Sequence, residues 1–98
     1  MIKEIRILNF EQMLELHSIL MPYLDENKEE QNVLAFTKKI LSKIKPQEYL
    51  DCVCLLTGTD KNDIKREDSM NALIAFTSGL SENKLLDFNF VAERVGLI

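Results

Sequence analysis

The sequence has few of the residues that make tight turns and few of those that carry chemistry. Its 98 residues include three Gly, two Pro, two Cys, one His and no Trp. So few turn residues argue against a sandwich or barrel of short strands, which needs a turn after each strand. No apolar run is long enough to cross a bilayer, and the opening MIKEIRILNF lacks the apolar core of a signal peptide. We therefore expect one soluble intracellular domain.

The charge balance is acidic. The chain has 16 Asp and Glu residues against 12 Lys and Arg, a net charge of −4. This disfavours nucleic acid and membrane surfaces as partners, because both select basic proteins. The carboxylates are scattered among lysines, and the sequence has no phosphate-binding glycine loop. His17 falls on an apolar helical face, as a core-edge histidine does. We therefore predict no enzymatic activity and no metal or cofactor.

The two cysteines, Cys52 and Cys54, are separated by one residue in an apolar segment. On a helix, side chains two positions apart point in different directions, so this pair is badly placed to share a metal ion or to form a disulfide. We expect two free thiols that pack as small hydrophobic side chains.

Helical periodicity runs through most of the chain. We predict a short extended arm over residues 1–8 and helices over residues 9–24, 27–45, 46–57, 67–82 and 84–95. Asn9 and Gln12 have the spacing of a capping box, and Gly58 suits the left-handed residue that ends a helix. The link after Gly58 is expected to hold one helical turn, pinned by Ile64. The predicted fold is all-α: about five short helices in a compact orthogonal bundle, with an arm that packs as coil or pairs with another copy.

The segment from Tyr49 to Phe90 is unusually apolar for so small a chain. Its helices carry apolar residues on more than one side, as in YLDCVCLLT and MNALIAFTSGL. Such helices either fill a dense core or leave a patch for self-association or a partner. We favour the second interpretation, that of an interaction module.

A DNA-binding interpretation of the same segment remains an alternative. Cys54, Gly58 and Ile64 match the spacing of a helix-turn-helix, which would start the recognition helix near Asn62. The residues from 60 to 68 carry a net negative charge, which is unfavourable against phosphates. A small helix-turn-helix regulator is therefore the second choice.

Two stretches of the C-terminal half resemble the tail assembly chaperones of long-tailed bacteriophages and related prophages. LDCVCLLTGTDKNDIKRED resembles the leucine-rich helix, Leu-Thr-Gly and short acidic turn of that family, and NALIAFTSGLSENKLLDF resembles its following helix. The opening EIRILNFEQMLEL, an extended arm entering a helix, is also similar. The resemblance covers most of the chain. The segment 25–30 and the two cysteines are not matched.

This resemblance implies a helical, acidic, oligomerising protein without enzymatic activity. Its partner would be the tape measure protein, a long and aggregation-prone helical rod that is kept soluble until tail tube subunits polymerise around it. The protein would act in the cytoplasm of the bacterial host and be absent from the mature virion. The chain ending at Gly96-Leu97-Ile98 would be the short form of a frameshifted pair. A structural head–tail adaptor is a further alternative.

We expect an apolar groove formed by the third to fifth helices to receive amphipathic segments of the rod, with weak contacts adding by multivalency. Phe76→Asp and Phe90→Asp are each expected to abolish solubilisation of the partner while the domain stays helical. Sequence alone does not separate core positions from contact positions. The candidate contact residues are Leu55, Leu56, Phe76, Leu80, Leu86 and Phe90.

Overall fold

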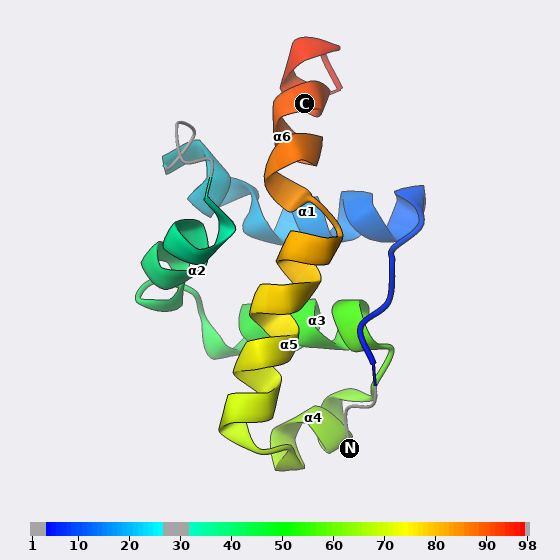
Figure 1. The fold of residues 1–98 in the computed structure, drawn as a ribbon, viewed down its shortest axis with the longest axis vertical. Coiled ribbons are helices and arrows are strands. Elements are labelled where there is room, and N and C mark those ends of the chain that lie inside the picture. Colours follow the sequence, from blue (N-terminus) through cyan, green and yellow to red (C-terminus); the bar gives the residue numbers. More distant parts are fainter. Residues whose placement is uncertain (1–3, 27–31, 98) are drawn as a thin grey trace.

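The computed structural model describes residues 4–26 and 32–97, and all regular secondary structure in these ranges is helical. The helices, in chain order, are α1 (Phe10–Glu26), α2 (Val33–Leu41), α3 (Pro46–Thr57), α4 (Lys61–Arg66), α5 (Ser69–Glu82) and α6 (Leu85–Arg94). α5 and α6 follow one another along the long axis of the molecule, and α1 and α3 lie across it (Figure 1). The predicted all-α bundle is confirmed.

Local sequence signals set several helix ends. Asn9 Oδ1 accepts a hydrogen bond from the Gln12 N–H at 2.8 Å, and Gln12 Oε1 accepts one from the Asn9 N–H at 3.0 Å. This is the capping box predicted for the first helix. Gly58 closes α3 with φ +72, the left-handed conformation expected there. The helical turn predicted in the link is α4, and Ile64 is its buried residue.

Several predicted helix ends differ from the structure. α1 ends at Glu26, two residues beyond the predicted end, with Pro22 inside it and Leu24 buried in the core. The segment 27–45 is not one helix: Asn32 has extended backbone angles, and its side chain caps α2 by accepting from the N–H groups of Leu34 and Ala35. Residues 27–31 lie outside the described part of the chain.

The core is centred on the packing of α3 against α5. α3 packs against α1, α4 and α5, while α2 packs against α5, and α6 reaches α1. A Cβ added at Gly79 would lie 2.8 Å from Leu56 Cδ1, so α3 and α5 cross in close contact at this glycine. The side chains with no exposed area are Leu16, Leu20, Phe36, Ile40, Cys52, Val53, Leu56, Phe76, Leu80 and Leu85.

Residues 4–9 form an extended coil that is bonded to the helices. The Arg6 N–H donates to the Leu56 carbonyl at 2.7 Å, and Arg6 Nε donates to the Leu55 carbonyl at 3.0 Å. Asn83, at the end of α5, joins this arm through both ends of its amide: Oδ1 accepts from the Leu8 N–H, and Nδ2 donates to the Arg6 carbonyl. Of the two arrangements expected for the arm, the described residues adopt packed coil.

Candidate functional site

Three of the six predicted contact residues belong to the core. Leu56, Phe76 and Leu80 have no exposed area, and the ring of Phe76 lies edge-on to that of Tyr49 at 5.0 Å between centroids. They cannot touch a partner while the fold is intact, so their assignment as contact residues was wrong. Periodicity misled here because α3 and α5 are each covered by several neighbouring helices. Phe76→Asp would bury an unpaired carboxylate in the core and destabilise the fold, so this substitution does not test a surface contact.

The other three predicted contacts reach the surface to different degrees. Leu55 and Leu86 are half-buried, packed against the core from its edge. Phe90 is 58% exposed. The groove was predicted between the helices that the structure gives as α3, α5 and α6. These helices do not bring the six residues together on one surface. Among the six, Phe90 alone has a largely exposed side chain.

α6 is attached to the rest of the fold by one side. Leu85, Asn89 and Ala92 are its buried residues, with the i, i+4, i+7 spacing of a single face. The Asn89 Oδ1 lies 2.8 Å from Nε2 of the buried His17 on α1. The His17 ring also lies beside that of Phe88, at 5.6 Å between centroids. His17 is thus a core residue that joins α1 to α6.

The opposite side of α6 carries four exposed residues at the spacing i, i+3, i+4, i+7: Asp87, Phe90, Val91 and Arg94. We call these four residues the outer stripe. Its two apolar members are more than half exposed, at 58% for Phe90 and 55% for Val91. The guanidinium carbon of Arg94 lies 5.4 Å from the centre of the Phe90 ring, a cation–π contact. An apolar pair framed by two opposite charges thus faces solvent.

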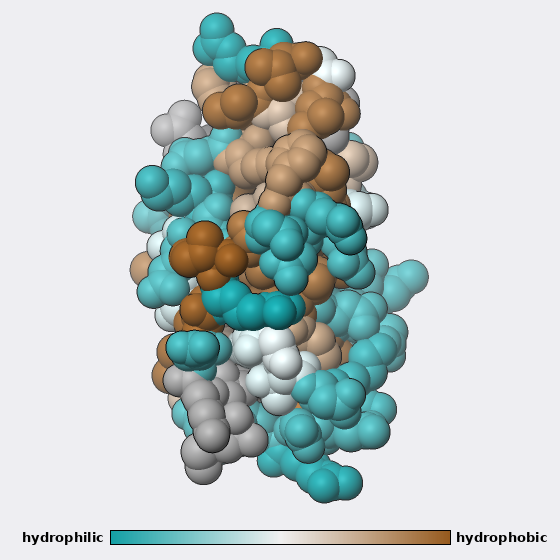
Figure 2. All heavy atoms as spheres, turned by 90° about the vertical axis from the view of Figure 1, so that its right-hand side faces the viewer, coloured by the Kyte–Doolittle hydropathy of each residue, from teal (hydrophilic) through white to brown (hydrophobic). Residues whose placement is uncertain are grey.

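More apolar surface lies beside the outer stripe. Val95 and Leu97, which follow on from α6, are exposed, and so is Phe10 at the start of α1. The Phe10 ring lies 6.4 Å from that of Phe88, which places the start of α1 next to α6. Figure 2 shows apolar atoms gathered over the upper part of the molecule, at the height of α6 in Figure 1. Large exposed apolar patches of this kind mark interaction sites.

α5 offers a second exposed apolar surface. Met70 and Ile74 are 58% and 54% exposed, one turn apart on the helix. No charged residue occurs in α5 before Glu82. Two apolar side chains on an otherwise uncharged helix form a smaller patch than that of α6, with no aromatic residue exposed.

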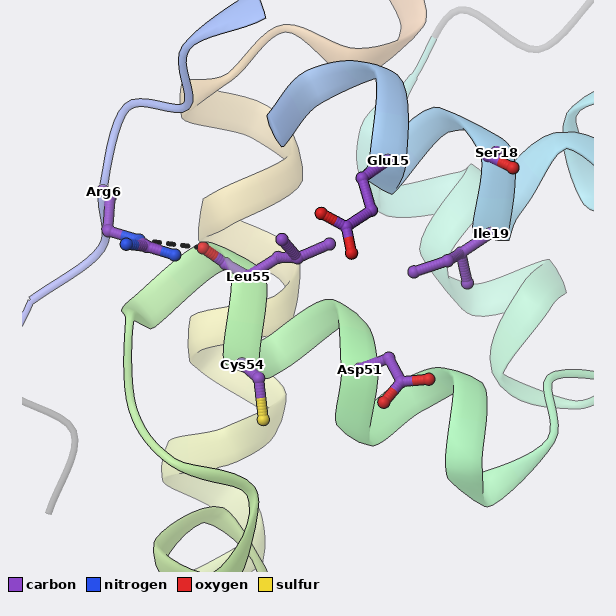
Figure 3. A pocket seen from close by; sticks show the side chains of 7 residues that line it. All are labelled: Arg6, Glu15, Ser18, Ile19, Asp51, Cys54 and Leu55. Atoms are coloured by element: carbon purple, nitrogen blue, oxygen red, sulfur yellow. Dashed lines mark hydrogen bonds between the residues drawn. The ribbon is translucent and has the colours of Figure 1, made fainter. Parts of the chain in front are cut away.

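A cleft of about 560 Å³ is lined by residues of α1, α3 and the arm. Glu15 and Ile19 reach from α1 toward α3, and Leu55 points from α3 toward the Glu15 carboxylate (Figure 3). The Asp51 carboxylate on its rim is bonded to Lys61 Nζ at 3.0 Å. The residues that line the cleft are Arg6, Glu15, Ser18, Ile19, Asp51, Cys54 and Leu55. The cleft has no histidine to activate its one thiol.

The two thiols differ in exposure, as expected for side chains two positions apart on a helix. Cys52 is fully buried and Cys54 lines the cleft, and both are free. Burial raises the pKa of the Cys52 thiol far above its usual range, with Asp51 and Glu48 adding to the shift. Burial also raises the pKa of the Cys54 thiol. A raised pKa keeps a thiol protonated and unreactive at neutral pH.

We predict that iodoacetamide modifies Cys54 in the folded chain at least about tenfold faster than Cys52, because alkylation requires an accessible thiolate. Mass spectrometry of the digested protein measures both rates. The Cys54→Ser variant is the control: its remaining thiol should react only after denaturant is added. Equal rates at the two cysteines in the folded protein would contradict the burial of Cys52.

An apolar hollow of about 370 Å³ lies between α3, α4 and α5. Tyr49, Leu50 and Val53 line it from α3, Ile64 lines it from α4, and Ala72 lines it from α5. It is not the predicted groove, because that groove was expected between α3, α5 and α6, whereas no residue of α6 and none of the six candidate contacts line this hollow. Burial raises the pKa of the Tyr49 phenol, so that hydroxyl stays neutral.

α4 stands where a helix-turn-helix protein would have its recognition helix. It is six residues long, with Asp60 as its N-cap and Asp63 in its first turn. Carboxylates at the helix end that would approach DNA repel phosphates.

Within residues 4–26 and 32–97, no group of three His, Cys, Asp or Glu side chains could hold a metal ion. None of the helices described has the length and apolarity needed to cross a bilayer. Comparisons with protein-family profiles, curated proteins and solved structures find no match for this chain.

Proposed function

We propose that this chain is a non-enzymatic tail assembly chaperone that binds apolar segments of a phage tape measure protein through the outer side of α6. The observation that carries the proposal is the apolar area left open there, on Phe90, Val91 and Val95. A helix with one side in the core and an apolar opposite side is suited to receive a partner helix. The sequence resemblance supports the choice of partner.

The energetics favour many weak contacts over one strong contact. Full burial of a Phe or Val side chain contributes about 1.5–3 kcal/mol, so covering the exposed parts of these three side chains contributes about 3–5.5 kcal/mol. Loss of translational and rotational freedom on association costs at least about 4 kcal/mol. A single site is therefore weak. Repeated sites along a long rod raise the overall affinity by multivalency.

In this role the protein acts in the cytoplasm of the bacterial host and is released before the tail is complete. It needs no cofactor and no nucleic acid, in keeping with its net charge of −4. Its task is to cover apolar helical segments that would otherwise aggregate.

We predict that Val91→Asp reduces the soluble fraction of a co-expressed tape measure protein at least about fivefold, because a carboxylate in the contact must lose its hydration. The matched control is Ile74→Asp on α5. The two side chains are equally open, at 55% for Val91 and 54% for Ile74. Centrifugation of lysates followed by quantitative immunoblotting gives the soluble fraction, and circular dichroism verifies that both variants are folded.

Two outcomes would count against the proposal. Failure of the wild-type chain to raise the solubility of the tape measure protein would remove the function itself. Loss of solubilisation with Ile74→Asp but not with Val91→Asp would move the contact to α5.

A further inference from the structure

The outer stripe of α6 has opposite charges at its two ends. Asp87 lies in the first turn and Arg94 in the last, with Phe90 and Val91 between them. Among the described residues neither Asp87 nor Arg94 has an ion-pair partner, and the Arg94 guanidinium lies over the Phe90 ring. Two exposed charges and an apolar centre are therefore left without a complement within the chain.

We propose that the outer stripe pairs antiparallel with the outer stripe of a second copy of this chain. Suppose that the two-fold axis of an antiparallel pair passes midway between Phe90 and Val91 of each helix. Asp87 of each copy then faces Arg94 of the other. The same alignment sets Phe90 of one copy against Val91 of the other. The stripe is thus complementary to itself in both charge and apolar character, so in the free protein a second copy fits it.

The charges also select the direction of the pair. In a parallel arrangement Asp87 would face Asp87, and Arg94 would face Arg94, which destabilises the contact. The antiparallel arrangement replaces both repulsions by attractions. It also sets the positive end of each helix dipole beside the negative end of the other.

The expected pair is weak. α6 has 10 residues, so one helix from each copy forms an interface at the low end of specific contacts, below about 1,200 Å². The pair also occupies the surface assigned above to the tape measure protein. Partner binding would then displace the second copy, and the pair would keep Phe90 and Val91 covered until a partner is present.

Sedimentation equilibrium of the full chain tests the pairing. We expect a reversible monomer–dimer equilibrium, with dimer the main species at roughly 0.5 mM, as for small transient interfaces. Asp87→Arg and Arg94→Asp should each weaken the dimer at least about tenfold, because either change makes both charge contacts of the pair repulsive. These positions are exposed, so both variants should fold, as circular dichroism will verify.

Mixing the two variants gives the decisive result. One copy then has two cations and the other has two anions, so an antiparallel pair regains both attractions, and a heterodimer should form at least as well as the wild-type dimer. The double variant Asp87→Arg/Arg94→Asp should recover the homodimer for the same reason. Glu82→Arg is the control: it makes an equal charge change at an exposed position on α5, and its dimer should match that of the wild type.

Three results would overturn the proposal: a wild-type chain that stays monomeric, single variants that dimerise as well as the wild type, or a mixture that gives no heterodimer. The pairing does not depend on the tape measure partner. If co-expression shows no solubilisation, the mixing experiment still decides whether the stripes pair. If the stripes do not pair, the Val91→Asp result still decides the proposed function.

Discussion

Phe76→Ala is expected to lower the free energy of unfolding by about 3–5 kcal/mol, the usual cost of removing a fully buried phenylalanine. Phe76 has no exposed area and packs edge-on against Tyr49, so the change leaves a cavity beside the crossing of α3 and α5. This loss is a large share of the free energy of unfolding of a typical domain, which is about 5–15 kcal/mol. Urea unfolding followed by circular dichroism measures it.

Phe90→Ala is the matched control for this prediction. The Phe90 ring is 58% exposed, so its removal should change the free energy of unfolding by no more than about 1 kcal/mol. Similar losses for the two variants would mean that Phe90 is packed in the free protein, and the outer stripe would lose its open apolar centre.

Asn83→Ala is expected to lower the free energy of unfolding by about 2–4 kcal/mol, because each buried polar group left without a partner costs roughly 1–3 kcal/mol. The Asn83 amide is bonded to the Leu8 N–H, the Arg6 carbonyl and the Gly79 carbonyl. Its loss frees the arm from the end of α5. Hydrogen exchange should therefore become faster at the Leu8 amide, and urea unfolding gives the total loss.

Asn62→Ala serves as the control for Asn83→Ala. Asn62 is an exposed residue of α4, and its substitution should change the free energy of unfolding by less than about 0.5 kcal/mol. A result in which Asn83→Ala costs no more than Asn62→Ala would contradict the bonding of the arm.

The class of fold and many local details could be predicted from sequence because their causes lie within a few residues. The capping box of Asn9 and Gln12 spans three positions, and Gly58 ends α3 through its own backbone conformation. Ile64 is the lone large apolar residue of its short helix, which made its burial predictable. The boundary at Asn32 was missed because Glu29 and Glu30 are residue types that suit the first turn of a helix, so the helix was predicted to begin before Asn32.

The candidate site was predicted much less well. Periodicity indicates which face of a helix is apolar, but it does not indicate what covers that face. Leu56, Phe76 and Phe90 all fit apolar helical patterns, yet the first two are fully buried and the third is open. The outer stripe itself was missed, although Asp87, Phe90, Val91 and Arg94 share one helical face and could have been read as a set.

The sequence by itself thus determined the helical class, several caps and the net negative charge, because propensity, capping and charge are local or additive properties. Tertiary structure alone decided which apolar residues became surface. α6 packs by one side against α1 and leaves its other side open, whereas α5 buries Phe76 and Leu80 against its neighbours and leaves only Met70 and Ile74 largely exposed among its large apolar residues. Only the folded chain could also give Asn83 its role, since its hydrogen bond to Leu8 joins residues 75 positions apart.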